Sequence, residues 1–210
     1  LGERHLSQDH HFAYLKISEG CDHPCSFCSI PLMRGLHRSK PVEELLAEAT
    51  FLANNGVKEL IIIGQDTTDY GKDLYGERNI AGLLRKLSEI KGIEWIRLMY
   101  AYPSHFPDDL IEELAVNPKM IKYLDIPLQH ISDPVLKSMR RGITKRATLE
   151  LLAKLRARIP GLTIRTTLIT GYPAETEENF NELLEFIKEF KFDRLGVFTF
   201  SVEENTTSFI

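Results

Sequence analysis

Two patterns of apolar and polar residues alternate along the chain from Ala13 onward. Short apolar runs, typical of buried strands, are separated by longer segments in which apolar residues recur at helical spacing. The apolar runs occupy residues 13–18, 59–63, 95–100, 122–126, 162–169 and 194–200. Strands that alternate with helices indicate βαβ units and a parallel sheet.

The segments between the runs predict helices with recognisable ends. Pro41 is expected in the first turn of one helix, and Gly56 follows it where a glycine commonly ends a helix. Thr144 and Thr176 are expected to cap two later helices. Shorter helices are predicted over residues 79–90 and 107–116.

The number of repeats limits the possible folds. Six strands in a chain of 210 residues agree with about 30 residues per βα unit. A complete eightfold barrel usually needs about 250 residues. The pattern therefore predicts an α/β fold of six repeats, arranged either as a partial barrel or as an open, doubly wound sheet.

The two ends of the chain lack this pattern. We interpret residues 1–12 as a linker from an amino-terminal domain and residues 202–210 as the start of a linker to a carboxyl-terminal domain. Residues 13–201 then form one domain. The first residues are polar and do not form a signal peptide, and no apolar run approaches the roughly 20 residues that a bilayer requires.

Charge and cysteine content narrow the location and the partners. The formal net charge of -4 does not indicate a broadly basic nucleic-acid-binding surface, so we expect that this domain does not require nucleic acid. Only three cysteines are present, an odd number that does not fit a disulfide-rich secreted protein. A cytoplasmic location without membrane association is the expectation.

Chemistry-bearing residues gather in the loops that follow successive strands. In chain order these loops read EGCDHPCSFC, GQDTTDYG, YAYPSH, IPLQH and TGYPAET. The carboxyl ends of parallel strands meet at one edge of a sheet, which is where α/β proteins bind ligands. The five loops are therefore expected to share one active face.

All three cysteines lie in the first of these loops, at Cys21, Cys25 and Cys28. A structural zinc ion needs four ligands, so His23 or His37 would have to complete a zinc site. An iron–sulfur cubane held by three thiolates would instead leave one iron open for another ligand, whereas electron-transfer clusters usually have four cysteines. The spacing favours the catalytic arrangement, with zinc as the alternative.

The motif Cys21-x3-Cys25-x2-Cys28, with Phe27 before the third cysteine, resembles the radical S-adenosylmethionine (SAM) superfamily. The resemblance implies a (β/α)6 partial TIM-like barrel with parallel strands. It also implies a 4Fe-4S cluster with three cysteine ligands. The open iron of such a cluster binds the amino and carboxylate groups of SAM, and reductive cleavage gives a 5′-deoxyadenosyl radical.

Most of the chain, from about Tyr14 to Ser201, is similar to the methylthiotransferase branch, whose enzymes replace C–H with C–SCH3. The similar stretches are SEGCDHPCSFCSIPLMRG, GQD, DIPLQH, MRR and TGYPAETEENF. The pieces QDTTDYG, YAYP and RGLHRS resemble the subgroup that modifies the β-carbon of an aspartate in a small-subunit ribosomal protein. The tRNA adenosine subgroup is the first alternative, and a non-catalytic zinc-stabilised RNA-binding module is the second.

The resemblance also implies which residues bind SAM. The candidates are Phe27, Gln65, Asp66, Gln129, Thr167 and Gly171. Gln65 and Asp66 stand in place of the Gly-Gly-Glu motif that holds the SAM ammonium, and the altered letters leave open which of them does so. Arg140 or Arg141 is a candidate partner for the SAM carboxylate or for an acidic substrate.

Further partners follow from the same resemblance. The family pattern includes an amino-terminal domain with three more cysteines for a second 4Fe-4S cluster, and a small carboxyl-terminal substrate-recognition domain. A reductant such as a flavodoxin-type electron donor is expected, and the chain is expected to be a monomer. Because six βα units do not depend on metal for their core, we predict a stable fold without the cluster.

Overall fold

The computed structural model describes residues 11–208. Its frame is a six-stranded sheet in the order β1-β4-β5-β6-β7-β8, in which every neighbouring pair is parallel. These strands are β1 (Phe12–Lys16), β4 (Glu59–Ile63), β5 (Trp95–Leu98), β6 (Met120–Asp125), β7 (Thr163–Thr170) and β8 (Arg194–Thr199). The order follows the chain without reversal, whereas a doubly wound sheet reverses at a switch point. The fold is therefore the partial barrel.

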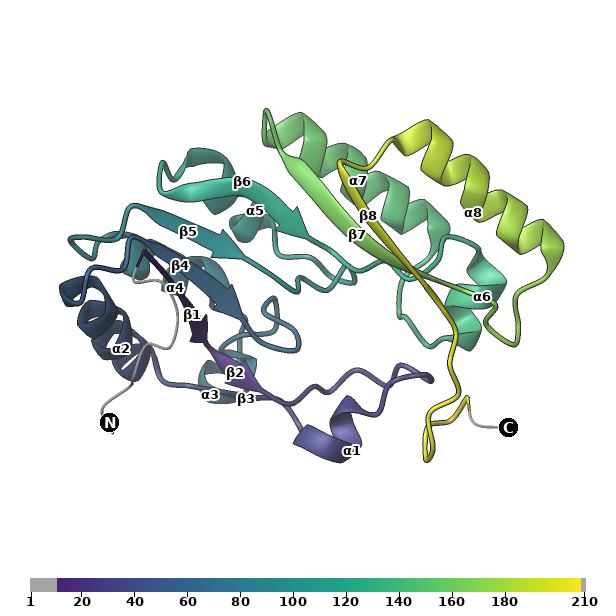
Figure 1. Ribbon diagram of the computed structural model, residues 1–210, viewed down its shortest axis with the longest axis horizontal. Helices are drawn as coiled ribbons and strands as arrows, with labels where there is room; N and C mark the ends of the chain where they lie inside the picture. The colour runs from purple at the N-terminus through teal and green to yellow at the C-terminus, as the bar shows by residue number, and fades with distance from the viewer. Residues whose placement is uncertain (1–10, 209–210) are drawn as a thin grey trace.

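Five longer helices connect the strands, and Figure 1 shows them along the outer side of the curved sheet. They are α2 (Val42–Asn54), α4 (Ile80–Ser88), α5 (Asp108–Val116), α7 (Lys145–Arg158) and α8 (Glu177–Phe190). Thr144 caps α7 by accepting a hydrogen bond from the Ala147 N–H, and Thr176 forms a capping box with Asn179 at the start of α8. Both predicted caps are confirmed. None of the helices within residues 11–208 is long and apolar enough to cross a membrane.

The two faces of the sheet differ in burial. On β4, Leu60 and Ile62 are fully buried against the helices, whereas Ile61 and Ile63 on the other face are only partly buried. The same alternation continues on β7, where Leu168 is buried and Thr167 is partly exposed. One large apolar core thus lies between sheet and helices, and the concave face remains accessible.

Several boundaries differ from the predictions by one or two residues, and three of the differences bear on the site. The first strand ends at Lys16, and Ser18–Glu19 instead form β2, which pairs antiparallel with β3 (Arg38–Ser39). The third strand ends at Leu98, before Tyr100 adopts a left-handed backbone (φ 57°) that a strand cannot contain. Pro41 is the residue before α2 and has an extended backbone, so it lies just outside the first turn.

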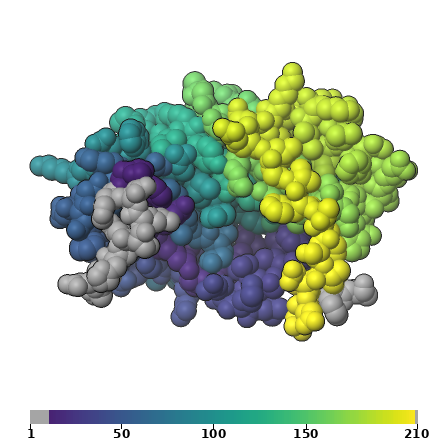
Figure 2. Space-filling model, viewed as in Figure 1, coloured from purple at the N-terminus to yellow at the C-terminus, as the bar shows by residue number. Residues whose placement is uncertain are grey.

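Short elements occupy the loops at the carboxyl ends of the strands. These are the β2–β3 ribbon and helices α1 (Ile30–Arg34), α3 (Lys72–Tyr75) and α6 (Asp133–Ser138). The segment after β8 returns to the same end, where the Ser208 N–H donates to the Ser26 carbonyl over 3.0 Å. In Figure 2 this yellow segment runs down to the purple segment that contains the cysteines.

Candidate functional site

The three cysteines lie in the loop between β2 and α1, here called the cysteine loop (residues 20–29). The ribbon closes the base of this loop, since the Cys21 N–H donates to the Gly35 carbonyl over 3.2 Å. Gly20 has a left-handed φ of 80°, and an added Cβ would lie 2.2 Å from the Leu36 carbonyl oxygen. Glycine is therefore required immediately before the first cysteine.

Ser26 fastens the middle of the cysteine loop to three other segments. Its N–H donates to the Met139 carbonyl over 3.1 Å, and its hydroxyl lies 3.0 Å from the Ser138 carbonyl at the end of α6. The same hydroxyl lies 2.8 Å from the Tyr172 hydroxyl, in the loop after β7. The bond from Ser208 completes the set. These four contacts connect the cysteine loop to α6, to the loop after β7 and to the segment after β8.

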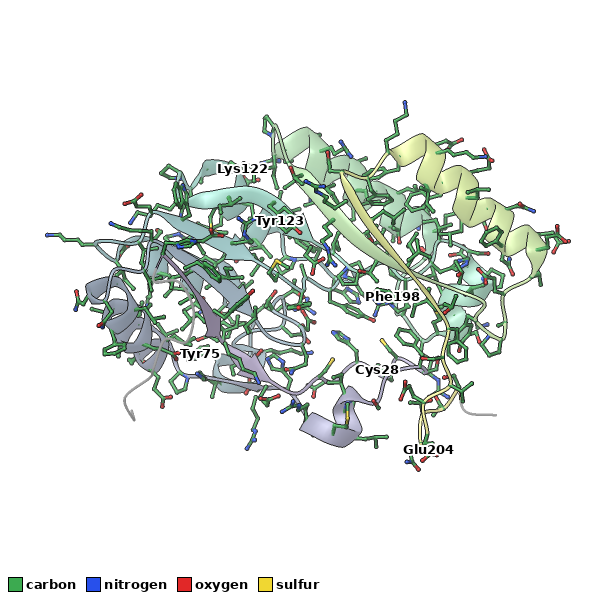
Figure 3. All side chains as sticks on the ribbon, viewed as in Figure 1. Cys28, Tyr75, Lys122, Tyr123, Phe198 and Glu204 are labelled. Carbon is green, nitrogen blue, oxygen red and sulfur yellow. The ribbon has the colours of Figure 1, made fainter. Side chains whose placement is uncertain are left out.

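All three cysteines are free thiols that face one pocket. Burial raises the pKa of Cys21 to about 12, and burial also raises the pKa of Cys28. Thiolates are the metal-binding form, so a bound metal ion would have to displace these protons. In Figure 3, Cys28 lies on the cysteine loop and Phe198 lies on β8.

The spacing of the ligand atoms does not favour a single zinc ion. Zn–S bonds of about 2.3 Å would bring the sulfurs to about 4 Å from one another. Among residues 11–208, however, only His23, Asp66 and Asp69 form a set of three possible ligand atoms within 4.8 Å, and that set contains no cysteine. The three sulfurs therefore do not all lie within 4.8 Å of one another, which suits a cluster with a different metal atom for each thiolate.

The histidines proposed as a fourth zinc ligand have other partners. His23 Nε2 lies 2.6 Å from Asp66 Oδ2, and its ring stacks on Tyr102 with 3.6 Å between centroids. His37 Nε2 lies 3.1 Å from the Ser39 hydroxyl. The contacts of His23 orient its ring within the protein. The buried Nδ1 of His37 has no hydrogen-bond partner, but His37 does not line the pocket with the cysteines.

The acidic groups beside the pocket are likewise satisfied by protein donors. Asp66 Oδ1 accepts hydrogen bonds from the N–H and hydroxyl of Thr68, at 2.8 and 2.6 Å. Burial opposes ionisation of Asp69, but the hydrogen bond and charge of Arg78 outweigh it and hold the pKa of Asp69 below its usual value. Asp66 and Asp69 therefore stabilise the loop after β4.

Three buried polar atoms lining the pocket with the cysteines have no hydrogen-bond partner: Gln65 Oε1, Gln129 Oε1 and Arg141 Nε. A buried polar atom without a partner costs about 1–3 kcal/mol, so such atoms normally meet a ligand or water. Gln65 and Gln129 offer acceptors and Arg141 offers a donor. This set fits a ligand that has both an ammonium and a carboxylate group, as the methionine part of SAM has.

Gln129 reaches the pocket through an unusual backbone. It has a left-handed φ of 73°, and a short bridge to β7 holds it, with its N–H donating to the Thr167 carbonyl and its carbonyl accepting from the Ile169 N–H. Such strain in a residue other than glycine is typical of functional positions. A second hollow shares Phe27 and Gln129 with the first and is completed by β7, β8 and the segment after β8.

The structure thus brings most of the sequence candidates together. Cys21, Cys25, Cys28, Phe27, Gln65 and Gln129 line the first pocket, and Thr167 lines the adjoining hollow. Two candidates are placed differently. Asp66 is buried behind the pocket, where Thr68 and His23 occupy its oxygens. Gly171 lines neither space, and its N–H donates to the Glu175 carboxylate.

Sequence reasoning did not single out Tyr102, and it did not decide which of Arg140 and Arg141 faces the site. Arg141 is buried and lines the cysteine pocket, whereas Arg140 is exposed and lines a separate outer groove. The available signal for Tyr102 was its place in the loop directly after a strand. Its contacts span distant parts of the chain, so the pattern could not assign its role.

Comparisons with known proteins agree with this geometry. The profile of the Radical SAM superfamily matches residues 15–187. A curated protein from Flavobacterium johnsoniae, described as ribosomal protein uS12 methylthiotransferase RimO, is 60% identical over 210 residues, which are 100% of this chain and 48% of that protein. One with the same description from Chloroherpeton thalassium is 57% identical, over 98% of this chain and 47% of that protein. The chain thus spans about half the length of the curated relatives it matches.

Solved structures share the fold at low sequence identity. The radical SAM methyltransferase TsrM from Kitasatospora setae, with cobalamin and a 4Fe-4S cluster bound, gives a TM-score of 0.77 at 18% identity, over 95% of this chain and 38% of that one. Methylornithine synthase (PylB) gives a TM-score of 0.64 at 17% identity, over 94% of this chain and 56% of that one.

Proposed function

The chain belongs to the radical SAM superfamily, and on that premise we propose that it catalyses methylthiolation of the β-carbon of an aspartate in a small-subunit ribosomal protein. The observation that carries the proposal is the pocket of three free cysteines, in which three partnerless polar atoms surround the same space. The 60% identity to a ribosomal-protein methylthiotransferase supports the choice of reaction and substrate.

Cys21, Cys25 and Cys28 would hold a 4Fe-4S cluster with one open iron, next to which SAM would bind. The cluster and SAM, when bound, supply an electron and a 5′-deoxyadenosyl radical that abstracts hydrogen from carbon. The protein's part is to orient these groups and to exclude water. The electron donor in the proposal is a protein of the flavodoxin type.

The polar residues of the pocket divide the binding of SAM between them. Gln65 is the better candidate for the SAM ammonium, because its Oε1 is free while its Nε2 donates to Glu19 over 3.1 Å. Asp66 instead orients His23 at the edge of the pocket. Phe27 and Thr167, which line the adjoining hollow with Gln129, would place the adenosine part.

Residues 13–201 form the catalytic unit in this proposal. The sulfur donor, held by a second 4Fe-4S cluster, would come from a further domain, in line with the length of the curated relatives. The site for the target aspartate would be the concave face of the sheet, next to the pocket. A ribosomal substrate places the reaction in the cytoplasm.

A modification assay tests the proposal. The reconstituted full-length protein, including the further domain that holds the sulfur donor, would be incubated with SAM, a low-potential reductant, a sulfide source and either the small-subunit ribosomal protein or tRNA. The expected result is a ribosomal protein whose mass rises by the replacement of H with SCH3, mapped to an aspartate by fragmentation. Modification of tRNA adenosine alone would contradict the proposed substrate, and failure to form 5′-deoxyadenosine would contradict the reaction class.

A further inference from the structure

Cys25 differs from the other two cysteines because its sulfur contacts a buried cation. Arg141 Nη1 donates to Cys25 Sγ over 3.3 Å, and the Tyr102 hydroxyl lies 3.7 Å from the same sulfur. No such contact from a cationic side chain to Cys21 or Cys28 occurs within residues 11–208. Two residues from distant loops thus single out one of the three expected cluster ligands.

Arg141 is fixed from several directions. Its Nη2 donates to the Pro127 carbonyl over 2.6 Å, and its own carbonyl accepts the Tyr102 hydroxyl at 2.6 Å. The guanidinium carbon lies 4.4 Å from the centroid of the Tyr102 ring. His23 stacks on a face of that ring, with 7° between the planes. Arg141 is only 4% exposed.

No carboxylate within residues 11–208 forms an ion pair with Arg141. Its recorded partners are the Cys25 sulfur, one carbonyl and one aromatic ring. A buried guanidinium without an anionic partner is costly, and a full negative charge nearby would offset that cost. The Cys25 sulfur stands for the thiolate that a bound cluster requires. The positive charge of Arg141 therefore lies next to the position where the negative charge of the cluster would be.

We propose that Arg141 is a positioning residue that sets the reduction potential of the cluster through the N–H bond to the Cys25 sulfur, with Tyr102 holding the guanidinium in place. This inference rests on the proposed function. Reduction adds one electron from the low-potential donor to the cluster, and no bond is made or broken and no proton moves in that step. The reduced cluster carries one more negative charge, so a cation and an N–H donor stabilise it more than the oxidised cluster.

The test is a redox titration of the reconstituted chain, followed by the electron paramagnetic resonance signal of the reduced cluster. Arg141→Met removes the charge and the N–H donor, and we expect the ratio of reduced to oxidised cluster at a fixed potential to fall about tenfold, which is about 59 mV for one electron. Arg141→Lys retains the charge without the planar fork and should shift the potential less. Tyr102→Phe keeps the ring but loses the hydroxyl, and a smaller shift in the same direction is expected.

Lys137→Met is the matched control, because Lys137 is an exposed cation of α6. It removes the same charge from the same part of the chain and should leave the potential unchanged. Iron content and thermal unfolding of each variant without the cluster identify changes in assembly or folding. If Arg141→Met does not assemble a cluster, Arg141→Lys and Tyr102→Phe must still lower the potential.

Two results overturn the inference in different ways. If every Arg141 and Tyr102 variant that assembles a cluster has the same reduction potential as the wild type, the inference is overturned and the proposed function stands. A wild-type chain that takes up no reducible cluster would overturn the inference and the proposed function together.

Discussion

The helix-covered side of the sheet and the pocket at its carboxyl end are built on opposite rules. On the helix side, residues such as Leu60, Ile62 and Leu98 are fully buried among other apolar side chains. In the pocket, buried polar atoms of Gln65, Gln129 and Arg141 lie beside free thiols and lack partners.

The difference separates the residues that stabilise the fold from the residues that bind ligands. The core consists of apolar side chains and contains none of the three cysteines, so we predict that it does not need the cluster. The pocket keeps polar groups unsatisfied at a cost that a bound ligand would recover. Substitutions in the core should therefore change unfolding, and substitutions in the pocket should change the binding of metal and cofactor.

The largest effect on stability is expected in the core. Leu60→Ala should lower the free energy of unfolding by about 3 kcal/mol, because it removes buried methyl groups and leaves a cavity. Leu36→Ala is the matched control at a residue 72% exposed, and its change should stay within about 0.5 kcal/mol. Urea unfolding without metal measures both, and equal effects would contradict the described core.

Gly20→Ala should affect both regions, because it lowers stability and also displaces the cysteine loop. Its Cβ would collide with the backbone of Gly35 and Leu36 and displace the start of the cysteine loop. Gly35→Ala has the same kind of left-handed φ (76°) but no atom within 4 Å of the added Cβ, so it isolates the strain from the collision. We expect Gly20→Ala to cost about 2 kcal/mol more than Gly35→Ala, and to lower iron uptake. Equal losses from the two variants would refute the collision.

Ser26→Ala tests whether the protein alone holds the cysteine loop. The variant loses hydroxyl contacts to Ser138 and Tyr172 in a buried position, and the free energy of unfolding should fall by about 1–2 kcal/mol. Ser88→Ala, which removes an exposed hydroxyl, provides the control with a smaller change expected. An unaltered stability of Ser26→Ala in the metal-free protein would mean that the loop is not fastened this way.

The smallest effect is expected at the surface pair of Glu182 and Lys145, whose charged atoms lie 2.7 Å apart. Burial opposes ionisation of Glu182, but the hydrogen bonds of Lys145 and Ser132 and the charge of Lys145 outweigh it, so the pKa of Glu182 lies below its usual value. A lowered carboxyl pKa stabilises the folded state above the unfolded value of about 4.3, and that contribution disappears as the pH falls through the folded pKa.

Lys145→Met should therefore reduce stability at neutral pH by less than about 1 kcal/mol, since the pair is partly exposed. The difference from wild type should vanish in acid. Lys188→Met removes a charge from a more exposed pair with Glu185 and should show a smaller dependence on pH. Urea unfolding at a series of pH values measures both variants. A deficit in Lys145→Met that persists at acidic pH would point to lost packing instead of lost charge.

Sequence patterns predicted the regions that depend on local chemistry. Short apolar runs located the six strands, and the threonines at positions 144 and 176 marked helix starts, because caps bond within a few residues. The cysteine motif likewise lies in one short segment. The contacts of Arg141 and Tyr102 with Cys25 span 116 and 77 positions, and that of Ser26 with Tyr172 spans 146. Such pairs are set by the topology of the barrel, so a linear pattern contains no signal for them.

The central claim is that the cysteine pocket holds a catalytic iron–sulfur cluster, and metal analysis with a SAM cleavage assay tests it most directly. After anaerobic reconstitution, the account predicts about four irons and four sulfides per chain. It also predicts 5′-deoxyadenosine formation under a strong reductant, and the loss of both in Cys25→Ala with the apolar core still folded. Stoichiometric zinc, without iron uptake and without SAM cleavage, would contradict the account.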